Sequence, residues 1–173
     1  MYIPPKHPKE SLTTHTDFVL PGETNPLNNL FGGELLARID KCCGISARRH
    51  TRRVCVTASV NHVSFHKPIP SGAVVTVVAK VSRAFNTSLE VIADITVEDR
   101  ETGEIMNAGS AIYTFVAVND MGAPVQIPEV LPETEEEQKR FNAALRRKQL
   151  SLILAGRMNP KDATELKALF IES

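Results

Sequence analysis

The chain is poor in several features that mark particular classes of protein. It has 173 residues, no tryptophan, three cysteines and 5% aromatic residues. Its 20 Lys and Arg balance 20 Asp and Glu, so no excess charge draws the whole molecule to nucleic acid or to an anionic membrane. No apolar run approaches the roughly 20 residues that cross a bilayer. We therefore expect a soluble protein with no nucleic-acid partner and no membrane insertion.

The cysteines and the first residues bear on location and on metals. The opening MYIPPKHPKE lacks the apolar block of a signal peptide, which favours a cytoplasmic location. Cys42 and Cys43 are neighbours and the total is odd, so we expect reduced thiols. With Cys55 as the third thiol and no suitably spaced histidine pair, the ligand pattern of a zinc site is missing. His62 and His66 fall on a strand and need not share a face, so no metal site is predicted.

What the chain does have is a clear change of hydrophobic period. A helix is predicted over residues 31–49, with a buried stripe of Leu35, Leu36, Ile39, Cys42, Cys43 and Ser46 or Ala47. Alternation with a period of two predicts strands over residues 13–20, 54–65, 75–81, 89–97 and 105–118, with a bulge near His62. One amphipathic helix followed by an antiparallel meander is buried most economically if the sheet curls round the helix, which predicts an α+β fold.

The last part of the chain has a helical pattern of its own. We therefore divide the whole chain into a domain over residues 1–130 and a C-terminal helical extension over 131–173. Thr134 and Glu137 form a capping box that opens a helix ending near Gly156. A second helix is predicted from Asn159, with an apolar side that includes Leu166, Leu169 and Phe170. We expect the charged run 135–140 to be a solvated face, and the two helices to dock on the sheet or on a neighbouring subunit.

No familiar nucleophile or phosphate-binding motif is present: there is no G-x-S-x-G, P-loop, G-x-G-x-x-G or H-E-x-x-H. Asp40 is the acid that stands out, because helical geometry places it at the rim of the buried stripe. A carboxylate there is partly desolvated yet able to reach a ligand, which suits a general base or a nucleophile. The alternative interpretation is a hydrated surface acid. Gly32 and Gly33 open the helix, where free N–H groups favour negative charge.

The run Asn25-Pro26-Leu27-Asn28-Asn29-Leu30-Phe31-Gly32-Gly33, followed seven residues later by Asp40, closely resembles the signature of hot-dog acyl-CoA thioesterases. The resemblance covers residues 13–130 and continues through V-T-A at 56–58, V-S-F-H-K-P at 63–68, N-T-S at 86–88 and F-V-A-V at 115–118. It implies a hot-dog fold with Asp40 as the catalytic carboxylate and Asn25 as its helper. The family usually has glycine where this chain has Asn28, and asparagine tolerates a left-handed backbone better than most residues.

The resemblance implies acyl-CoA hydrolysis with no metal or redox cofactor, coenzyme A being part of substrate and product. Asp40 then either deprotonates a water or forms a mixed anhydride, and Asn25 orients the water or the carbonyl. The N–H groups of Gly32 and Gly33 can receive the negative charge on the carbonyl oxygen. For the coenzyme A moiety the candidates are Arg83, Asn86, Thr87 and Ser88, with the basic run 48–53 as a second source of cations.

Two other functions remain open. A hot-dog dehydratase needs a histidine paired with an acid, and no such pair is evident. A non-catalytic acyl-CoA sensor has no need of a carboxylate near the thioester. The resemblance also implies a homo-oligomer built from dimers, with a hexamer made of three dimers as a larger form. In such a dimer Asn25 of one subunit serves Asp40 of the other.

Overall fold

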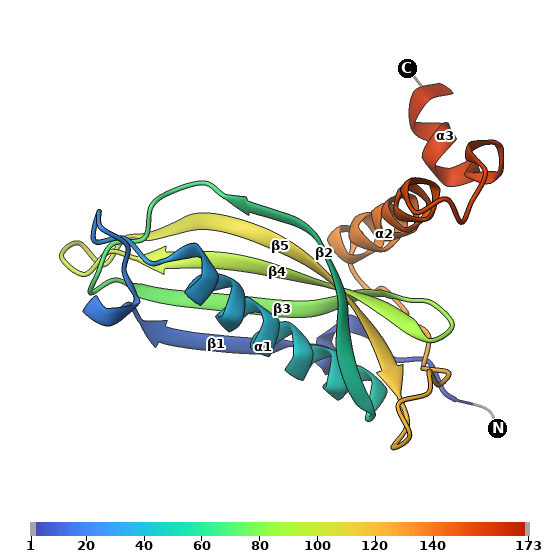
Figure 1. The fold of residues 1–173 in the computed structure, drawn as a ribbon, viewed down its shortest axis with the longest axis horizontal. Coiled ribbons are helices and arrows are strands. Elements are labelled where there is room, and N and C mark those ends of the chain that lie inside the picture. The colour runs from blue at the N-terminus through green and yellow to red at the C-terminus, as the bar shows by residue number, and fades with distance from the viewer. Residues whose placement is uncertain (1–2, 172–173) are drawn as a thin grey trace.

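The computed structural model describes residues 3–171, and its main body is a curved five-stranded sheet with one long helix along one face (Figure 1). The elements of this body are β1 (Thr13–Phe18), α1 (Gly32–Thr51), β2 (Val54–Phe65), β3 (Val74–Ala84), β4 (Ser88–Glu98) and β5 (Ile105–Val118). All paired strands are antiparallel, in the order β1-β3-β4-β5-β2. The predicted α+β arrangement of a curled sheet around a helix is confirmed.

The core lies between α1 and the inner face of the sheet. Most of the predicted helical stripe is inaccessible, and only Leu36 stays half-buried; the buried members are Leu35, Ile39, Cys42, Cys43, Ser46 and Ala47. The sheet meets this stripe with the alternate residues of its strands, such as Val75, Val77, Leu89 and Val91. Burying one such valine or leucine side chain contributes about 1.5–3 kcal/mol, so this single interface fixes which face of each strand points inward.

The strand order corrects the predicted meander. We expected the strands after the helix to be consecutive neighbours, and the β3–β4 and β4–β5 pairs confirm this. However, β2 pairs with β5 instead of β3, and β1 takes the place beside β3. Residues 66–73 carry the chain from the β2 edge of the sheet to β3, next to the opposite edge, and pass the start of α1 on the way. There Leu30 N donates to Ile69 O (2.7 Å) and Ser71 N donates to Asn28 O (2.9 Å). With this crossing the two edge strands, β1 and β2, both contact α1, which lets the sheet curl around the helix from either side.

The strand β2 forms one edge of the sheet and is irregular. Its pairing with β5 shifts between Val60 and His62, which is the predicted bulge, and also between Thr57 and Ser59, which we did not predict. Its apolar side chains are largely uncovered, with Val54 at 56% and Val56 at 47% exposure. A twelve-residue edge strand with exposed apolar side chains is a template for pairing with another chain.

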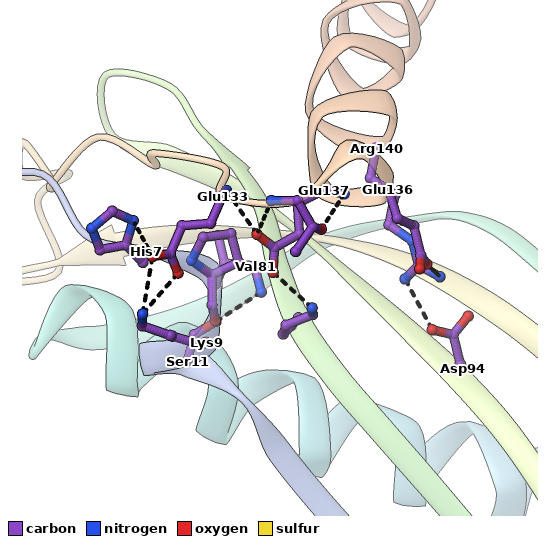
Figure 2. A network of polar contacts seen from close by, with 12 residues as sticks. His7, Lys9, Ser11, Val81, Asp94, Glu133, Glu136, Glu137 and Arg140 are labelled. Carbon is purple, nitrogen blue, oxygen red and sulfur yellow. Dashed lines mark hydrogen bonds and ion pairs between the residues drawn. The ribbon is translucent and has the colours of Figure 1, made fainter.

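The C-terminal helix α2 (Glu135–Leu154) begins at the predicted cap, where Thr134 Oγ1 accepts from Glu137 N (3.1 Å). Ion pairs fasten it to the outer face of the sheet: Lys80–Glu137 (2.9 Å), Asp94–Arg140 (2.9 Å) and Glu90–Arg147 (2.7 Å). Figure 2 shows Arg140 reaching down from α2 to Asp94. The expectation of a solvated face over 135–140 is therefore wrong for Glu137, which is buried because it meets Lys80 and the backbone N–H of Glu133.

The second tail helix starts later than predicted. The segment opens as a 3-10 turn, Pro160–Asp162, and α3 (Thr164–Ile171) follows after a break at Ala163. It contacts α2, where Leu166 N donates to Gln149 Oε1 (2.9 Å), while Phe170 is 76% exposed. Together α2 and α3 project away from the body of the sheet (Figure 1). The division of the chain at residue 130 stays a prediction.

Candidate active site

Asp40 lies half-buried on α1, at the edge of the apolar stripe where helical geometry places it. The hydroxyl of Thr57, on β2, donates to Asp40 Oδ1 at 2.7 Å. Within residues 3–171 we find no partner for Oδ2. One oxygen is thus held by the sheet and the other is available, which is the arrangement that a positioned base or nucleophile needs.

Asn25 stands in the loop that leads into α1, and its side chain shapes that loop. The side-chain Oδ1 of Asn25 accepts from Leu27 N (2.9 Å) and from Asn29 N (3.2 Å). The backbone N–H of Asn25 donates to Asn29 O (2.8 Å). The side-chain Nδ2 has no hydrogen-bond partner among the described residues. Because the oxygen is already engaged, the amide can offer a ligand only N–H donors.

The backbone at Asn28 explains how the loop tolerates the missing glycine. Its φ of 57° lies in the left-handed region, which confirms the expectation drawn from the residue type. Asn28 N donates to Asn25 O (2.9 Å), and Asn28 O accepts from Ser71 N. An asparagine therefore adopts the left-handed backbone conformation that this loop uses.

A cavity of about 310 Å³ lies at the start of α1 and is lined by Asn25, Gly32, Phe65 and His66 together with neighbouring residues. The helix begins at Gly32, and the residue before it, Phe31, supplies no side-chain cap. The first N–H groups of a helix have no partner inside it, so those at Gly32 and Gly33 remain available as donors. Of the two glycines, Gly32 lines this cavity and Gly33 does not.

Asp40 does not line the cavity that holds Asn25. It follows Gly32 by eight residues on α1, a rise of about 12 Å along the helix axis. One chain therefore presents an amide and a helix start at one place, and a carboxylate about two turns further along the helix.

The thiols are held in their protonated form. Burial raises the pKa of Cys43, and the neighbouring Cys42 thiol and Asp40 carboxylate raise it further. Burial likewise raises the pKa values of Cys42 and Cys55. Tyr113 donates to Leu36 O (3.3 Å), and burial raises its pKa to about 12. All three cysteines are free, as predicted, and none has the lowered pKa of a nucleophilic thiol.

The residues predicted to hold coenzyme A lie on the other side of the sheet from α1. Thr87 and Ser88 line a cavity of about 420 Å³ between the outer face and α2, which Lys148 and Arg157 also line. Lys148 Nζ lies 3.4 Å from Ser88 Oγ. Asn86 is exposed and does not line this cavity, although its backbone O accepts from Ile127 N (3.1 Å).

Arg83 has partners that the sequence did not reveal. Its guanidinium carbon lies 4.0 Å from the centroid of the Phe141 ring, and Nη1 donates to Phe141 O (3.1 Å). The Phe85 ring lies on a further side, at 5.8 Å. Burial lowers the pKa of Arg83. In this structure Arg83 fastens α2 to the sheet, and its contact with coenzyme A stays a prediction.

Within residues 3–171 there is no group of three or more His, Cys, Asp or Glu placed to hold a metal ion. No helix in the same range is both long and apolar enough to span a bilayer.

The site residue that the sequence did not single out is Thr57. Its signal was its phase on β2, two residues after the partly buried Cys55 and so on the face that turns toward α1.

A curled antiparallel sheet around one helix, with an oriented carboxylate on that helix and an amide at its start, defines the class of hot-dog thioester hydrolases. Comparisons agree with this class. Residues 27–104 match the family described as "Thioesterase superfamily". The chain is 43% identical over 139 residues to "Uncharacterized acyl-CoA thioester hydrolase YkhA" of Bacillus subtilis (strain 168), a match that spans 80% of this chain and 81% of that protein.

Solved structures give the same answer. An apo-hexameric acyl-CoA thioesterase superposes with a TM-score of 0.85 at 33% identity, over 88% of this chain and 98% of that one. An acyl-CoA hydrolase from Staphylococcus aureus, solved with butyryl coenzyme A, coenzyme A and coenzyme A disulfide, superposes with a TM-score of 0.81 at 35% identity, over 95% of this chain and 99% of that one. Variants of that hydrolase carry alanine in place of an aspartate, an asparagine or a threonine.

The chain belongs to the acyl-CoA thioester hydrolases of the thioesterase superfamily.

Proposed function

We propose that this chain hydrolyses acyl-CoA with Asp40 and Asn25 as its catalytic pair and Thr57 as the residue that orients Asp40. The observation that carries the proposal is the 2.7 Å hydrogen bond from Thr57 to a half-buried carboxylate. The comparison with the S. aureus hydrolase supports it. The substituted asparagine, aspartate and threonine of that enzyme are 15 and 17 positions apart, the separations that relate Asn25, Asp40 and Thr57 here.

The proposed chemistry adds water across the carbonyl–sulfur bond. The free Oδ2 of Asp40 either takes a proton from the attacking water or attacks the carbonyl carbon to give a mixed anhydride that water then cleaves. In both routes negative charge grows on the carbonyl oxygen. The N–H groups of Gly32 and Gly33 and the Nδ2 of Asn25 are donors suited to that charge. Coenzyme A then leaves as its thiolate.

The proposed assembly is a dimer joined along β2. Its support is the exposed apolar edge of that strand, which a second copy would cover while extending the sheet. In this dimer Asn25 faces Asp40 of the partner subunit, which accounts for their separation within one chain. Three such dimers make the proposed hexamer, the form of the apo-hexameric relative.

For the coenzyme A moiety we propose binding by Thr87 and Ser88, with Asn86 and Arg83 at the adjoining turn. The cavity beside Thr87 and Ser88 supplies a cation of its own in Lys148. Phosphate recognition by a protein of zero net charge requires such local cations. Arg83 joins this set only if the nucleotide competes with Phe141 for its guanidinium.

We also propose that the reaction needs no metal or redox cofactor, because a carboxylate, an amide and a helix start supply every group that the chemistry uses. Prolonged dialysis against a chelator should then leave the rate unchanged. A cytoplasmic location is proposed as well, and the three free thiols support it, since reduced cysteines persist in that compartment.

The test is release of free coenzyme A thiol from acyl-CoA substrates of graded chain length. Asp40→Asn and Asn25→Ala should each lower kcat by at least about 10²-fold, because each removes a group that acts in the transition state. Thr57→Val should lower kcat by about tenfold, the rate equivalent of one hydrogen bond to a charged group. All three variants should keep their circular dichroism spectra.

Matched controls separate catalysis from folding. Asp120→Asn removes an exposed carboxylate in the turn after β5, and Thr76→Val removes a surface hydroxyl that bonds Thr16 at 2.9 Å. Both should retain the wild-type rate. A wild-type protein that binds acyl-CoA but releases no thiol at any chain length would favour the sensor alternative, and a normal rate in Asp40→Asn would remove this carboxylate from the mechanism.

A further inference from the structure

Arg38 is a charged side chain in an unexpected place. It lies on α1 two residues before Asp40, and its side chain is only 8% exposed. Its Nη2 donates to Glu23 Oε2 (2.7 Å) and to Phe18 O (2.9 Å), while Asp17 Oδ2 lies 4.0 Å away. Its Nη1 is buried and has no hydrogen-bond partner among the described residues. All these contacts of the Arg38 side chain are with residues that precede α1 in the chain.

Glu23, the residue that Arg38 holds, stands where the Asn25 loop closes. Its backbone O accepts from Phe31 N (2.8 Å), and the neighbouring residues Thr24 and Leu30 form an antiparallel bridge. Its carboxylate also accepts from Leu20 N (2.8 Å). The backbone N–H of Leu20 and the Arg38 guanidinium lower the pKa of Glu23, so the carboxylate stays ionised. Glu23 therefore contacts both ends of the Asn25 loop, and Arg38 connects it to α1.

An ion pair with a buried guanidinium is a costly way to join two segments. Removing a guanidinium from water carries a large desolvation penalty, and the unpartnered Nη1 adds to it. An apolar side chain at position 38 would fill the same space at less cost, so packing alone does not account for this arginine. What this contact adds is direction, because Nη2 is held at two points, by the Glu23 carboxylate and by the Phe18 carbonyl.

We propose that Arg38 is a positioning residue for catalysis: through Glu23 it sets the place of Asn25 relative to α1. The inference rests on the proposed catalytic role of Asn25. The other side of the loop is held independently, by Leu30 N to Ile69 O (2.7 Å) and Ser71 N to Asn28 O (2.9 Å). Loss of Arg38 therefore loosens the Glu23 end, two residues before Asn25, while the far end of the loop stays attached. Glu23 itself keeps its contacts with Leu20 N and Phe31 N.

The first test is a comparison of Arg38→Met with Arg38→Lys. Arg38→Met should lower kcat by about ten- to a hundredfold with little change in KM, because a small displacement of a donor acts on the transition state. Arg38→Lys keeps the charge and should recover part of kcat. The control is Lys80→Met, which removes the partner of buried Glu137 on the outer face and should lower the melting temperature without lowering kcat.

The second test is a double-mutant cycle. If Arg38 acts through Asn25, Arg38→Met should have no further effect on kcat in an Asn25→Ala background. Hydrogen–deuterium exchange gives a readout that needs no activity: the peptide over residues 20–31 should exchange faster in Arg38→Met, and the peptide around Thr57 should not. If Arg38→Met does not fold, Glu23→Gln weakens the same contact and should show the same pattern with a smaller effect.

The outcomes distinguish the two proposals. An Asn25→Ala enzyme with the wild-type rate overturns the catalytic pair, and this inference with it. An impaired Asn25→Ala enzyme in which Arg38→Met costs the same factor as in the wild type overturns the inference alone. Unchanged exchange over residues 20–31 in Arg38→Met also overturns it.

Discussion

His50, at the C-terminal end of α1, is fully buried and depends on one hydrogen bond. Its Nε2 lies 2.8 Å from Pro128 O and must donate its proton there. Its Nδ1 is buried without a partner in the part of the chain that the structure describes. Burial lowers the pKa of His50, and the nearby Lys6 ammonium lowers it further. The folded state therefore prefers the neutral ring.

This preference makes stability depend on pH in a stated direction. The unfolded chain takes up a proton as pH falls through about 6.5, whereas folded His50 resists until a lower pH. Stability is thus fully present above pH 6.5 and is lost below it, by up to about 1.4 kcal/mol for each pH unit between the two pKa values. Urea unfolding at pH 7.5 and pH 5.5 measures the loss.

The matched variant for this prediction is His50→Gln, whose amide can still donate to Pro128 O but does not titrate. It should lose less stability than the wild type over the same pH interval. Equal losses in the two proteins would mean that groups other than His50 set the acid sensitivity.

Single residues also show where reading the sequence succeeds and where it stops. The place of Asp40 follows from helical geometry, because a 3.6-residue period fixes which side of α1 it occupies. Thr57 as its partner does not follow, since the period of a strand says nothing about which helical residue it will face. Arg83 is a second example. Its contact with Phe141 joins residues 58 positions apart, and no local sequence pattern predicts such a contact.

At the scale of elements, the end of β2 is packed against β5 at a glycine that has no room for a side chain. Gly109 has a φ of 155°, and a Cβ there would lie 2.1 Å from Ser64 O. The pairing of β4 with β5 shifts at the same place, between Ile95 and Thr96. Phe65, the partner of Gly109 on β2, is followed by His66, and both line the cavity beside Asn25.

Gly109→Ala should therefore destabilise the protein by about 1–3 kcal/mol, since the backbone oxygen of Ser64 has to move. Thermal unfolding followed by circular dichroism gives the melting temperature. Gly22→Ala is the control, because a Cβ at Gly22 meets nothing within 4 Å, and its melting temperature should stay close to that of the wild type. A Gly109→Ala protein as stable as the control would show that β2 shifts freely at this point.

The elements themselves were predictable from the sequence, but the place of β2 in the sheet was not. The period of the apolar residues placed α1 and the five strands within a few residues, and the Thr134 cap fixed the start of α2. The pairing of β2 with β5 was missed, because residues 66–73 resemble a short turn between neighbours but run across the sheet. A sequence period reports which side of a strand is buried and carries no record of which strand lies next to it.

At the scale of the whole molecule, the proposed composite site can be tested with mixed dimers. Asn25→Ala and Asp40→Ala homodimers each have two damaged sites, but a mixed dimer has one site with both lesions and one with none. Co-refolding equal amounts should restore about a quarter of the wild-type activity, since half of the dimers are mixed and half of their sites are intact. Thiol release measures the recovery.

Proof of subunit exchange, for example by mass spectrometry of differently tagged chains, is the necessary control. Activity that never exceeds the average of the two parents despite exchange would mean that each site is built within one chain. The proposed dimer along β2 would then need a different arrangement of the loops.

The strand order has a further consequence, for how the chain reaches this structure. The strands β3, β4 and β5 are joined by short hairpins and can pair as soon as they exist, whereas the partners of β2 lie 44 to 64 residues further along the chain. Closing so long a loop is slow compared with hairpin formation. During synthesis β2 therefore waits without its partner strand until β5 has emerged. The window for aggregation is set by translation of residues 66–118, and the strand that we propose to join two subunits is the one left unpaired longest.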